Sequence, residues 1–270
     1  MAATRRLAFA GAALALGGAV VTGCAATRQV AEPGAGRPHR AAPLAIPRHS
    51  PVRDSCRAVA AVRPTPTRSF AALVRTDAAI RRFPSGGPVL VRVGAIDENG
   101  YPTVLGVVGS RTAAGSCRPV AYRVQLPVPP NMRTGWIPAR AVHVFSVGNR
   151  IVVDLSTRLL VAYRDGTPAL RARVAIGAPQ TPTPVGRYFV DERWLLASAN
   201  GPFGIAALGI SAHSNVLHDW VQEGPIALHG TDDPSAIGQA VSHGCVRLSN
   251  DDMRRLLKLA PAGTPVVIRR

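Results

Sequence analysis

One cysteine near the end of the chain stands among residues that could make it chemically active. Cys245 lies in the stretch VSHGCVRLSN, residues 241–250, directly after His243 and Gly244. A lone cysteine can be a buried small side chain, half of a disulfide, a metal ligand or a nucleophile. A nucleophilic thiol needs a base to ionise it, donors for the developing oxyanion and a group that orients the base. The residues around Cys245 include candidates for these parts.

The candidate base is His229, which ends the apolar stretch GPIALHG. It would lie beside Cys245 if the two segments are neighbouring strands. Glycine lets the backbone approach a substrate closely, so the N–H groups of Gly244 and Cys245 are candidate oxyanion donors. Ser242 and Arg247 add donors for oxyanion binding or substrate positioning at the same rim. The alternatives for this pair are a structural core histidine and a buried packing cysteine.

A zinc site is the competing interpretation of this histidine-rich region. Its possible ligands are His213, His218, His229, His243 and Cys245. The sequence has no CxxC or HExxH pair, which are the common spacings of zinc ligands. We therefore predict no metal and no cofactor.

The segment IALHGTDDPSAIGQAVSHGCVRLSN, residues 226–250, closely resembles the active-site signature of the L,D-transpeptidase catalytic domain of bacterial cell walls. That signature has a His-Gly, a spacer of roughly a dozen residues, and then Ser/Thr-His-Gly-Cys followed by an apolar residue and Arg or Asn. Supporting similarities are the segments RIVVDLS, TPTPVGRYFV, GPFGIAALGISAHS and GTPVVI. The resemblance therefore covers residues 149–270.

The resemblance implies a role for each residue of the site. Cys245 would be the nucleophile and His229 the general base, with the backbone carbonyl of Gly230 orienting the imidazole. His243 would support the oxyanion region rather than remove the proton. Arg247 stands where some members of the family have Asn, which leaves its role less defined. The segment YFVDERWLLASANGPFG matches the region that forms a flap over the cleft.

The implied reaction is acyl transfer between the stem peptides of peptidoglycan. A Cys245 thioester would form as D-Ala leaves a donor tetrapeptide, and a second stem would then attack to give a 3→3 cross-link. Attack by water would instead make the protein an L,D-carboxypeptidase. A third possibility is a catalytically inactive lipoprotein that binds the cell wall. The family also implies covalent trapping by carbapenem-type β-lactams.

The first residues have the pattern of a targeting segment. Residues 1–23 combine Arg5 and Arg6 with an apolar run from Leu7 to Val21 that is short for a membrane span. The box Val21–Cys24 resembles a bacterial lipoprotein cleavage site, which implies lipidation of Cys24. An ordinary secretory leader is the alternative. In both cases we expect an exported protein, and in the first it is anchored to the outer face of the cytoplasmic membrane.

The remaining chain is expected to be mainly β. Residues 24–67 are rich in Pro, Ala and Arg and are expected to form a linker. Residues 68–146 contain short apolar runs between turn clusters, and GWIPARAV resembles the last strand of an SH3-like barrel. The run SFAALVRTDAAIRRF fits a strand or a helix equally well. The resemblance implies that 149–270 form a β-sandwich-like catalytic domain with a few short helices, one of them starting at Asn250 as N-cap.

The other cysteines have separate explanations. Cys56 and Cys117 flank or lie in the first folded segment of a chain that we expect to be exported, where disulfides persist. A Cys56–Cys117 disulfide would close a loop of about 60 residues and stabilise the fold by roughly 4 kcal/mol. Both cysteines could instead be unpaired and buried. Pairing them leaves Cys245 alone.

The net charge of +17 is unevenly distributed. Residues 1–148 have 19 Lys+Arg and 5 Asp+Glu, a net +14, whereas residues 149–270 have 13 and 10, a net +3. No basic stripe with interleaved aromatic residues and no known nucleic-acid motif is present, so we expect no nucleic-acid partner. The excess fits attraction to an anionic membrane surface or wall polymer.

Overall fold

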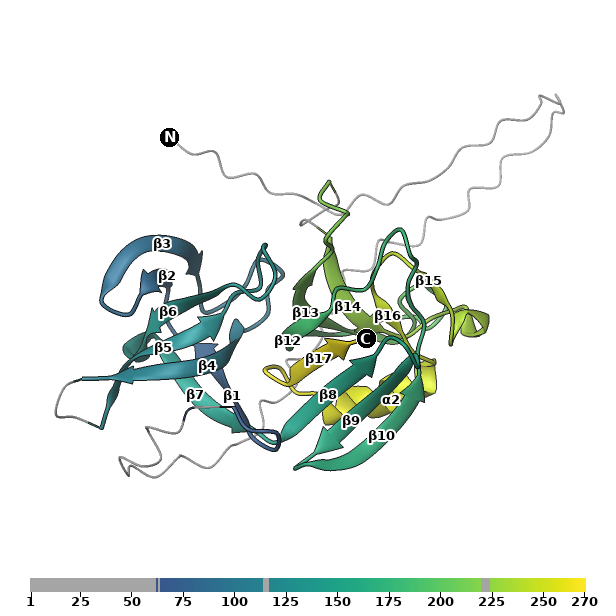
Figure 1. Ribbon diagram of the computed structural model, residues 1–270, viewed down its shortest axis with the longest axis horizontal. Coiled ribbons are helices and arrows are strands. Elements are labelled where there is room, and N and C mark those ends of the chain that lie inside the picture. The colour runs from purple at the N-terminus through teal and green to yellow at the C-terminus, as the bar shows by residue number, and fades with distance from the viewer. Residues whose placement is uncertain (1–61, 63, 114–116, 220–223) are drawn as a thin grey trace, which may run out of the picture. The chain divides into compact units, whose positions relative to one another are not determined.

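The computed structural model describes residues 62, 64–113, 117–219 and 224–270. The fold is mainly β, as the sequence predicted (Figure 1). The leader 1–23, the lipidation box Val21–Cys24 and Cys56 lie outside the described residues, as does almost all of the linker 24–67. Within the described residues, no helix is both long enough and apolar enough to cross a membrane.

The first folded segment is a seven-stranded antiparallel sheet in the order β3-β2-β6-β5-β4-β1-β7. Its elements are β1 (Ser69–Val74), β2 (Ala78–Phe83), β3 (Gly86–Val93), β4 (Val104–Thr112), β5 (Pro119–Gln125), β6 (Thr134–Pro138), the 3₁₀ turn η1 (Ala139–Ala141) and β7 (Val142–Val147). The SH3-like assignment of this segment stays a prediction.

The ambiguous run SFAALVRTDAAIRRF forms two strands, β1 and β2, and not a helix. Phe70, Ala72 and Val74 alternate along β1 into a core that also contains Ile80 of β2. This alternation has the period of two that a strand requires, and it lets one face of the sheet be buried. The tertiary core therefore decides between two periods that the local sequence leaves open.

The second sheet has eight strands in the order β10-β9-β8-β17-β12-β13-β14-β16. Its strands are β8 (Asn149–Asp154), β9 (Leu159–Arg164), β10 (Thr167–Arg173), β12 (Gly186–Leu195), β13 (Ala206–His213), β14 (Pro225–His229), β16 (Val246–Arg247) and β17 (Pro265–Arg269). The pairs β8–β17 and β14–β16 are parallel and the others antiparallel. A separate parallel pair joins β11 (Ile176–Gly177) to β15 (Ala240–Ser242), and η3 (Pro234–Ala236) precedes β15.

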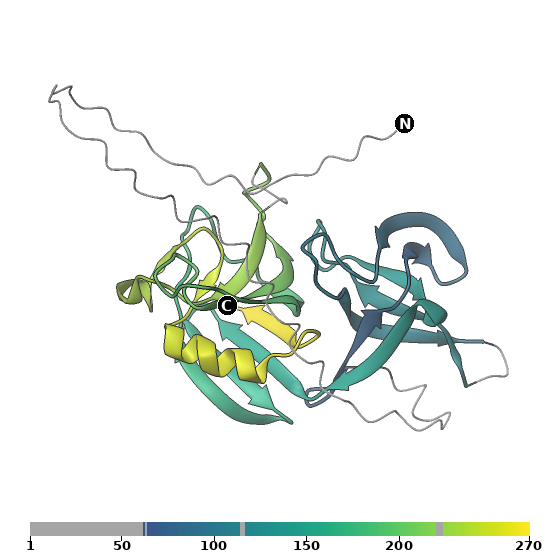
Figure 2. The ribbon, with the colours of Figure 1, turned by 180° about the vertical axis from the view of Figure 1, so that it is seen from behind.

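Helix α2 (Asn250–Leu259) covers one face of this sheet, as Figure 2 shows. It packs against β9, β10 and β13 with its buried residues Met253, Leu256 and Leu259. The N-cap is Ser249, whose Oγ accepts a hydrogen bond from the Asp252 N–H at 3.1 Å. The prediction of Asn250 as N-cap was therefore wrong by one residue. Asn250 instead accepts a hydrogen bond from the Ile205 N–H at 3.2 Å, so its side chain ties the start of the helix to another segment.

Residues of β12 and β13 contact the first sheet and the loop before β6. Phe189 of β12 is buried in the core of the first sheet, against Gly106. The Gln125 Nε2 donates a hydrogen bond to the Arg187 carbonyl at 2.7 Å. The side-chain amide of Asn131 also forms two hydrogen bonds with the backbone of His213 in β13: its Nδ2 donates to the His213 carbonyl, and its Oδ1 accepts from the His213 N–H, each at 2.8 Å. The first sheet thus packs directly on the sheet that contains Cys245.

Candidate active site

Two short strands bring Cys245 and His229 to one part of the sheet. β14 ends at His229 and β16 begins at Val246, directly after Cys245. The strands are parallel neighbours (Figure 1), and their register pairs His229 with Arg247. Cys245 lies directly before the first residue of β16, and its Sγ accepts a hydrogen bond from the Ala227 N–H of β14.

The imidazole of His229 is held in one orientation. Its Nδ1 lies 2.6 Å from the Gly230 carbonyl oxygen, which can only accept a hydrogen bond. Nδ1 therefore donates in the neutral ring, and Nε2 is left as the acceptor. The ring of Phe203 packs against the imidazole with the centroids 4.8 Å apart. This is the tautomer that a general base at Nε2 requires.

The surroundings of His229 favour its neutral form. The side chain is buried, with 3% of its surface exposed. Burial, together with the Arg247 charge, lowers the pKa of His229 to about 4, although the hydrogen bond to Gly230 acts in the opposite direction. His229 is therefore neutral near pH 7 and can accept a proton.

Cys245 is partly exposed, and it is a free cysteine. The N–H of Ala227 on β14 donates a hydrogen bond to the Cys245 Sγ at 3.4 Å. Burial raises the pKa of the Cys245 thiol, whereas this hydrogen bond and the Arg247 charge lower it; the overall shift is upward. A neutral thiol beside a neutral imidazole means that proton transfer would accompany attack on a substrate rather than precede it.

The loop before Cys245 is ordered by its own serine. Ser242 is buried, and its Oγ accepts a hydrogen bond from the Gly244 N–H at 3.1 Å and donates one to the Cys245 carbonyl at 2.5 Å. Gly244 has a φ of +119°, and a Cβ there would collide with Ile226 Cδ1 at 2.8 Å. Ser242 therefore orders the loop before Cys245, and the Gly244 N–H is hydrogen-bonded within that loop.

The charge of Arg247 acts on both His229 and Cys245. Its backbone forms two hydrogen bonds of 2.9 Å with Ala175, so the residue is fixed between β14 and the segment before β11. Its charge lowers the pKa of both His229 and Cys245. Within the described residues its buried Nε has no hydrogen-bond partner. A buried donor without a partner costs free energy.

The other predicted histidines occupy different environments. His243 is exposed, next to the buried Gly244, whereas His229 is buried. His213 ends β13, and His218 is exposed in the following loop. In the part of the chain that the structure describes, no group of three or more His, Cys, Asp or Glu side chains could hold a metal ion.

Three residues near the site were not singled out from the sequence. Thr183 bonds to the loop of Cys245, Phe203 packs on His229, and Asn250 holds the backbone beside Phe203. Substituting Gly230 with any larger residue would push a side chain into the Asn250 Oδ1. The only sequence signal for Thr183 was its place in TPTPVG, which predicts a rigid loop but not its contact.

Of the two cysteines of the predicted disulfide, Cys56 and Cys117, only Cys117 lies within the described residues. Cys117 is disulfide-bonded in the structure. Its predicted partner, Cys56, lies outside the described residues, so the pairing stays a prediction.

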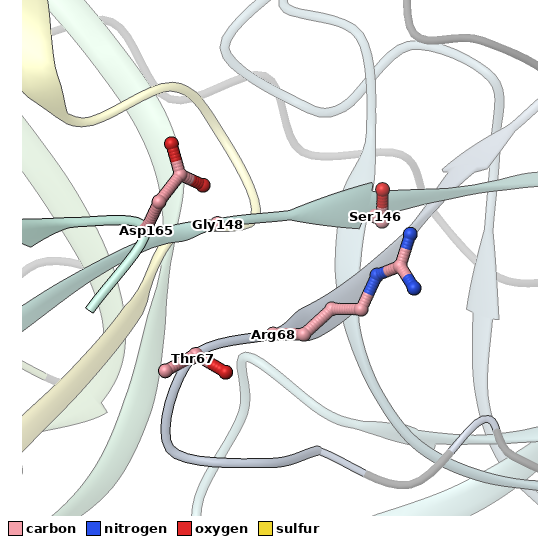
Figure 3. Close-up of a pocket in the computed structure, with 5 residues that line it drawn as sticks. All are labelled: Thr67, Arg68, Ser146, Gly148 and Asp165. Atoms are coloured by element: carbon pink, nitrogen blue, oxygen red, sulfur yellow. The ribbon is translucent and has the colours of Figure 1, made fainter.

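A cavity of about 410 Å³ is lined by residues that are not among the candidate catalytic residues (Figure 3). It is lined by Thr67, Arg68, Ser146, Gly148 and Asp165, and Figure 3 shows the Arg68 side chain reaching toward Ser146. None of these residues contacts the loop of Cys245 in the described hydrogen bonds. The cavity is therefore not part of the candidate active site.

Residues 148–268 match the family model of the YkuD L,D-transpeptidase catalytic domain. The YkuD protein of Bacillus subtilis is 29% identical over 126 residues, which are 47% of this chain and 69% of that protein. The YkuD protein of Bacillus licheniformis is 34% identical over 119 residues, 44% of this chain and 64% of that protein. A solved mutant L,D-transpeptidase of Enterococcus faecium is 26% identical, with 44% of this chain and 49% of that chain covered and a TM-score of 0.36.

The second sheet, in which His229 ends β14 and Cys245 directly precedes the neighbouring β16, lies almost entirely within the segment that matches the family model of the L,D-transpeptidase catalytic domain. The matched segment is less than half of this chain, and it spans about two thirds of the two curated relatives.

Proposed function

We propose that this protein is an L,D-transpeptidase that forms 3→3 cross-links in peptidoglycan through a Cys245 thioester. The observation that supports it most is the parallel register of β14 and β16. It pairs the end of β14, where the His229 Nδ1 is hydrogen-bonded to the Gly230 carbonyl, with the strand that directly follows the free, partly exposed Cys245. The family match over 148–268 supports the substrate class.

The first half-reaction acylates the enzyme. His229 Nε2 accepts the thiol proton as the Cys245 Sγ attacks the carbonyl between the third stem residue, a diamino acid, and the terminal D-Ala. The C–N bond then breaks, and the proton passes from His229 to the departing amine of D-Ala. The donor stem remains as a thioester on Cys245.

The second half-reaction transfers the stem. The side-chain amine of an acceptor stem attacks the thioester carbonyl and loses its proton to His229, and the thiolate of Cys245 leaves and takes that proton. An amide bond replaces the thioester, so the energy of the original peptide bond is conserved without ATP. Water in place of the amine would give the L,D-carboxypeptidase outcome, which the products distinguish.

Product analysis tests this function. We expect the purified protein to release D-Ala from stem tetrapeptides and to form cross-linked dimers, both detected by mass spectrometry. Cys245→Ser and His229→Gln should each lower the rate by at least about 100-fold, while Asp232→Asn on the exposed surface serves as a control. Full activity in Cys245→Ser, or the absence of any D-Ala release from the wild type, would contradict the proposal.

We also propose that carbapenem-type β-lactams acylate Cys245. The strained ring carbonyl presents the same electrophile as the stem peptide, so the same thiol and base would act on it. Intact-mass analysis after incubation with imipenem should find one adduct, and peptide mapping should locate it on Cys245. The Cys245→Ala variant should remain unmodified, and an adduct elsewhere would count against this assignment.

The location of the protein is a further part of the proposal. We propose that it is exported, lipid-anchored through Cys24 and extended from the membrane by the linker 24–67, with an SH3-like segment over 68–146. Its support is the sequence alone, in the targeting pattern of 1–23 and the box Val21–Cys24. Membrane fractionation tests it, because Cys24→Ser should move the protein from the membrane fraction to the soluble exported fraction.

A further inference from the structure

Thr183, in the loop between β11 and β12, is hydrogen-bonded to the backbone of Gly177 in β11 and to that of Gly244, directly before Cys245. Its side chain is buried, with 4% of the residue surface exposed. The Oγ1 accepts a hydrogen bond from the Gly177 N–H at 2.8 Å and donates its proton to the Gly244 carbonyl at 2.8 Å. A hydroxyl has one proton, so the donor of Thr183 is committed to Gly244.

This hydrogen bond sets the direction of one peptide group. In a trans peptide the C=O and the N–H point in opposite directions. The carbonyl of Gly244 points at Thr183, so the N–H of the same peptide group, that of Cys245, points away from Thr183. Gly244 has a φ of +119°, a conformation that residues other than glycine rarely adopt. Because glycine can adopt many backbone conformations, the hydrogen bond from Thr183 is what holds the Gly244–Cys245 peptide group in this orientation.

The other candidate oxyanion donor is not available. The Gly244 N–H already donates to Ser242 Oγ at 3.1 Å. Among the described hydrogen bonds none uses the Cys245 N–H. Of the two donors that the sequence suggested, the Cys245 N–H is therefore the one that can bind an oxyanion.

We infer that Thr183 is a positioning residue that aims the Cys245 N–H at the developing oxyanion. This inference rests on the proposed acyl transfer, and it adds a residue outside the sequence signature to that site. During acylation the substrate carbonyl oxygen becomes negatively charged, and a donor already directed at it lowers the barrier. Loss of the Thr183 hydroxyl would let the Gly244–Cys245 peptide group rotate and misdirect its N–H.

Two reactions of the same sulfur separate this role from a structural one. Acylation by imipenem passes through a tetrahedral oxyanion. Alkylation by iodoacetamide does not, because the Sγ–C bond forms as iodide leaves and the thiol proton passes to His229 or solvent. A misdirected oxyanion donor slows the first reaction alone, whereas a displaced thiol or base slows both.

The experiment measures both rates on the full chain for four proteins: wild type, Thr183→Val, Thr183→Ser and Thr264→Val. We expect Thr183→Val to lower the acylation rate about 10- to 100-fold and to leave the alkylation rate within about threefold. Thr183→Ser keeps the hydroxyl and should restore acylation. Thr264 is fully buried, and its hydroxyl donates to the Pro261 carbonyl at 2.6 Å, so Thr264→Val is a matched loss of a buried hydrogen bond elsewhere.

Several results would overturn the inference. These are equal acylation by wild type and Thr183→Val, a parallel fall of both rates, an acylation loss in Thr264→Val of the same size, and failure of Thr183→Ser to restore the rate. If Thr183→Val does not fold, Thr183→Ala provides the same comparison without the extra methyl groups. A wild type that alkylates but is never acylated would refute the proposed function, and the role of Thr183 with it.

Discussion

In the proposed mechanism, His229 determines the acidic limit of the reaction. The neutral ring donates from Nδ1 to Gly230, and burial among apolar side chains opposes a second proton. Together they keep the imidazole of His229 neutral near pH 7. The imidazole is protonated only when the pH approaches its pKa of about 4.

We predict that the rate of acylation by imipenem stays nearly constant from pH 7 down to about pH 5 and falls as His229 is protonated near its pKa of about 4. Stopped-flow or quenched mass spectrometry checks this at each pH, with circular dichroism as a control for folding. An inflection near the ordinary histidine value of 6.5 would show that His229 is not the base, or that it is not buried during the reaction.

Arg247 offers a second prediction at the residue scale. Its charge lowers the pKa of both Cys245 and His229. Arg247→Gln keeps a polar side chain but removes the charge, so the pKa of His229 should rise and the acidic limb of the acylation profile should move to higher pH. NMR titration of His229 in the variant checks the shift. An unchanged limb would mean that solvent already screens Arg247 from the pair.

The elements near the site are held by hydrogen bonds between segments that are far apart in the sequence. Asn250 at the start of α2 accepts the Ile205 N–H and lies against Gly230. The same helix is capped by Ser249, and its apolar side packs on the sheet. Helix α2 therefore connects the segment of Phe203 to the end of β14.

We predict that Ser249→Ala lowers the free energy of unfolding by about 1 kcal/mol, because the Asp252 N–H loses its acceptor at the helix N-terminus. Urea denaturation checks the value. Ser235→Ala, in the exposed turn before β15, is the control and should change the free energy of unfolding by less than about 0.5 kcal/mol. A similar loss in both variants would argue against capping as the cause.

At the scale of the whole molecule, acidic side chains meet where the two sheets are joined. The Asn99 Nδ2 donates to Glu192 Oε1 at 2.8 Å. The neighbouring Asp191 is desolvated and close to Glu192, and burial followed by this like charge raises the pKa of Asp191 to about 8. Burial also raises the pKa of Glu192. The folded protein thus holds protons on these carboxyls that the unfolded chain releases near pH 4.

This difference makes stability depend on pH. A folded pKa above the unfolded value stabilises the fold below the unfolded pKa, and the stabilisation is lost as pH rises through the folded pKa. The Asp191 contribution is therefore lost between about pH 4 and pH 8. His229 has the opposite sign, because its folded pKa of about 4 lies below the unfolded 6.5, and its contribution is gained between those values as pH rises.

We predict that Asp191→Asn is more stable than the wild type at pH 8, by on the order of 3 kcal/mol, and differs little at pH 4. The amide resembles the protonated carboxyl in shape and can still accept the Glu192 N–H, which donates to Asp191 Oδ1 at 2.9 Å. Urea denaturation at both pH values checks the prediction, with Asp232→Asn as an exposed control. Equal stability at pH 8 would mean that Asp191 is ionised in the folded protein.

The sequence by itself determined the mainly β class, the two reactive residue types and the spacing between them. It did so because alternation of apolar residues and a short motif are local properties of the chain. Strand partners, register and hydrogen-bond partners depend on residues distant in sequence. Only the tertiary structure therefore decided that SFAALVRTDAAIRRF is two strands, that Ser249 rather than Asn250 caps α2, that Ser242 occupies the Gly244 N–H, and that Thr183 faces the Gly244 carbonyl.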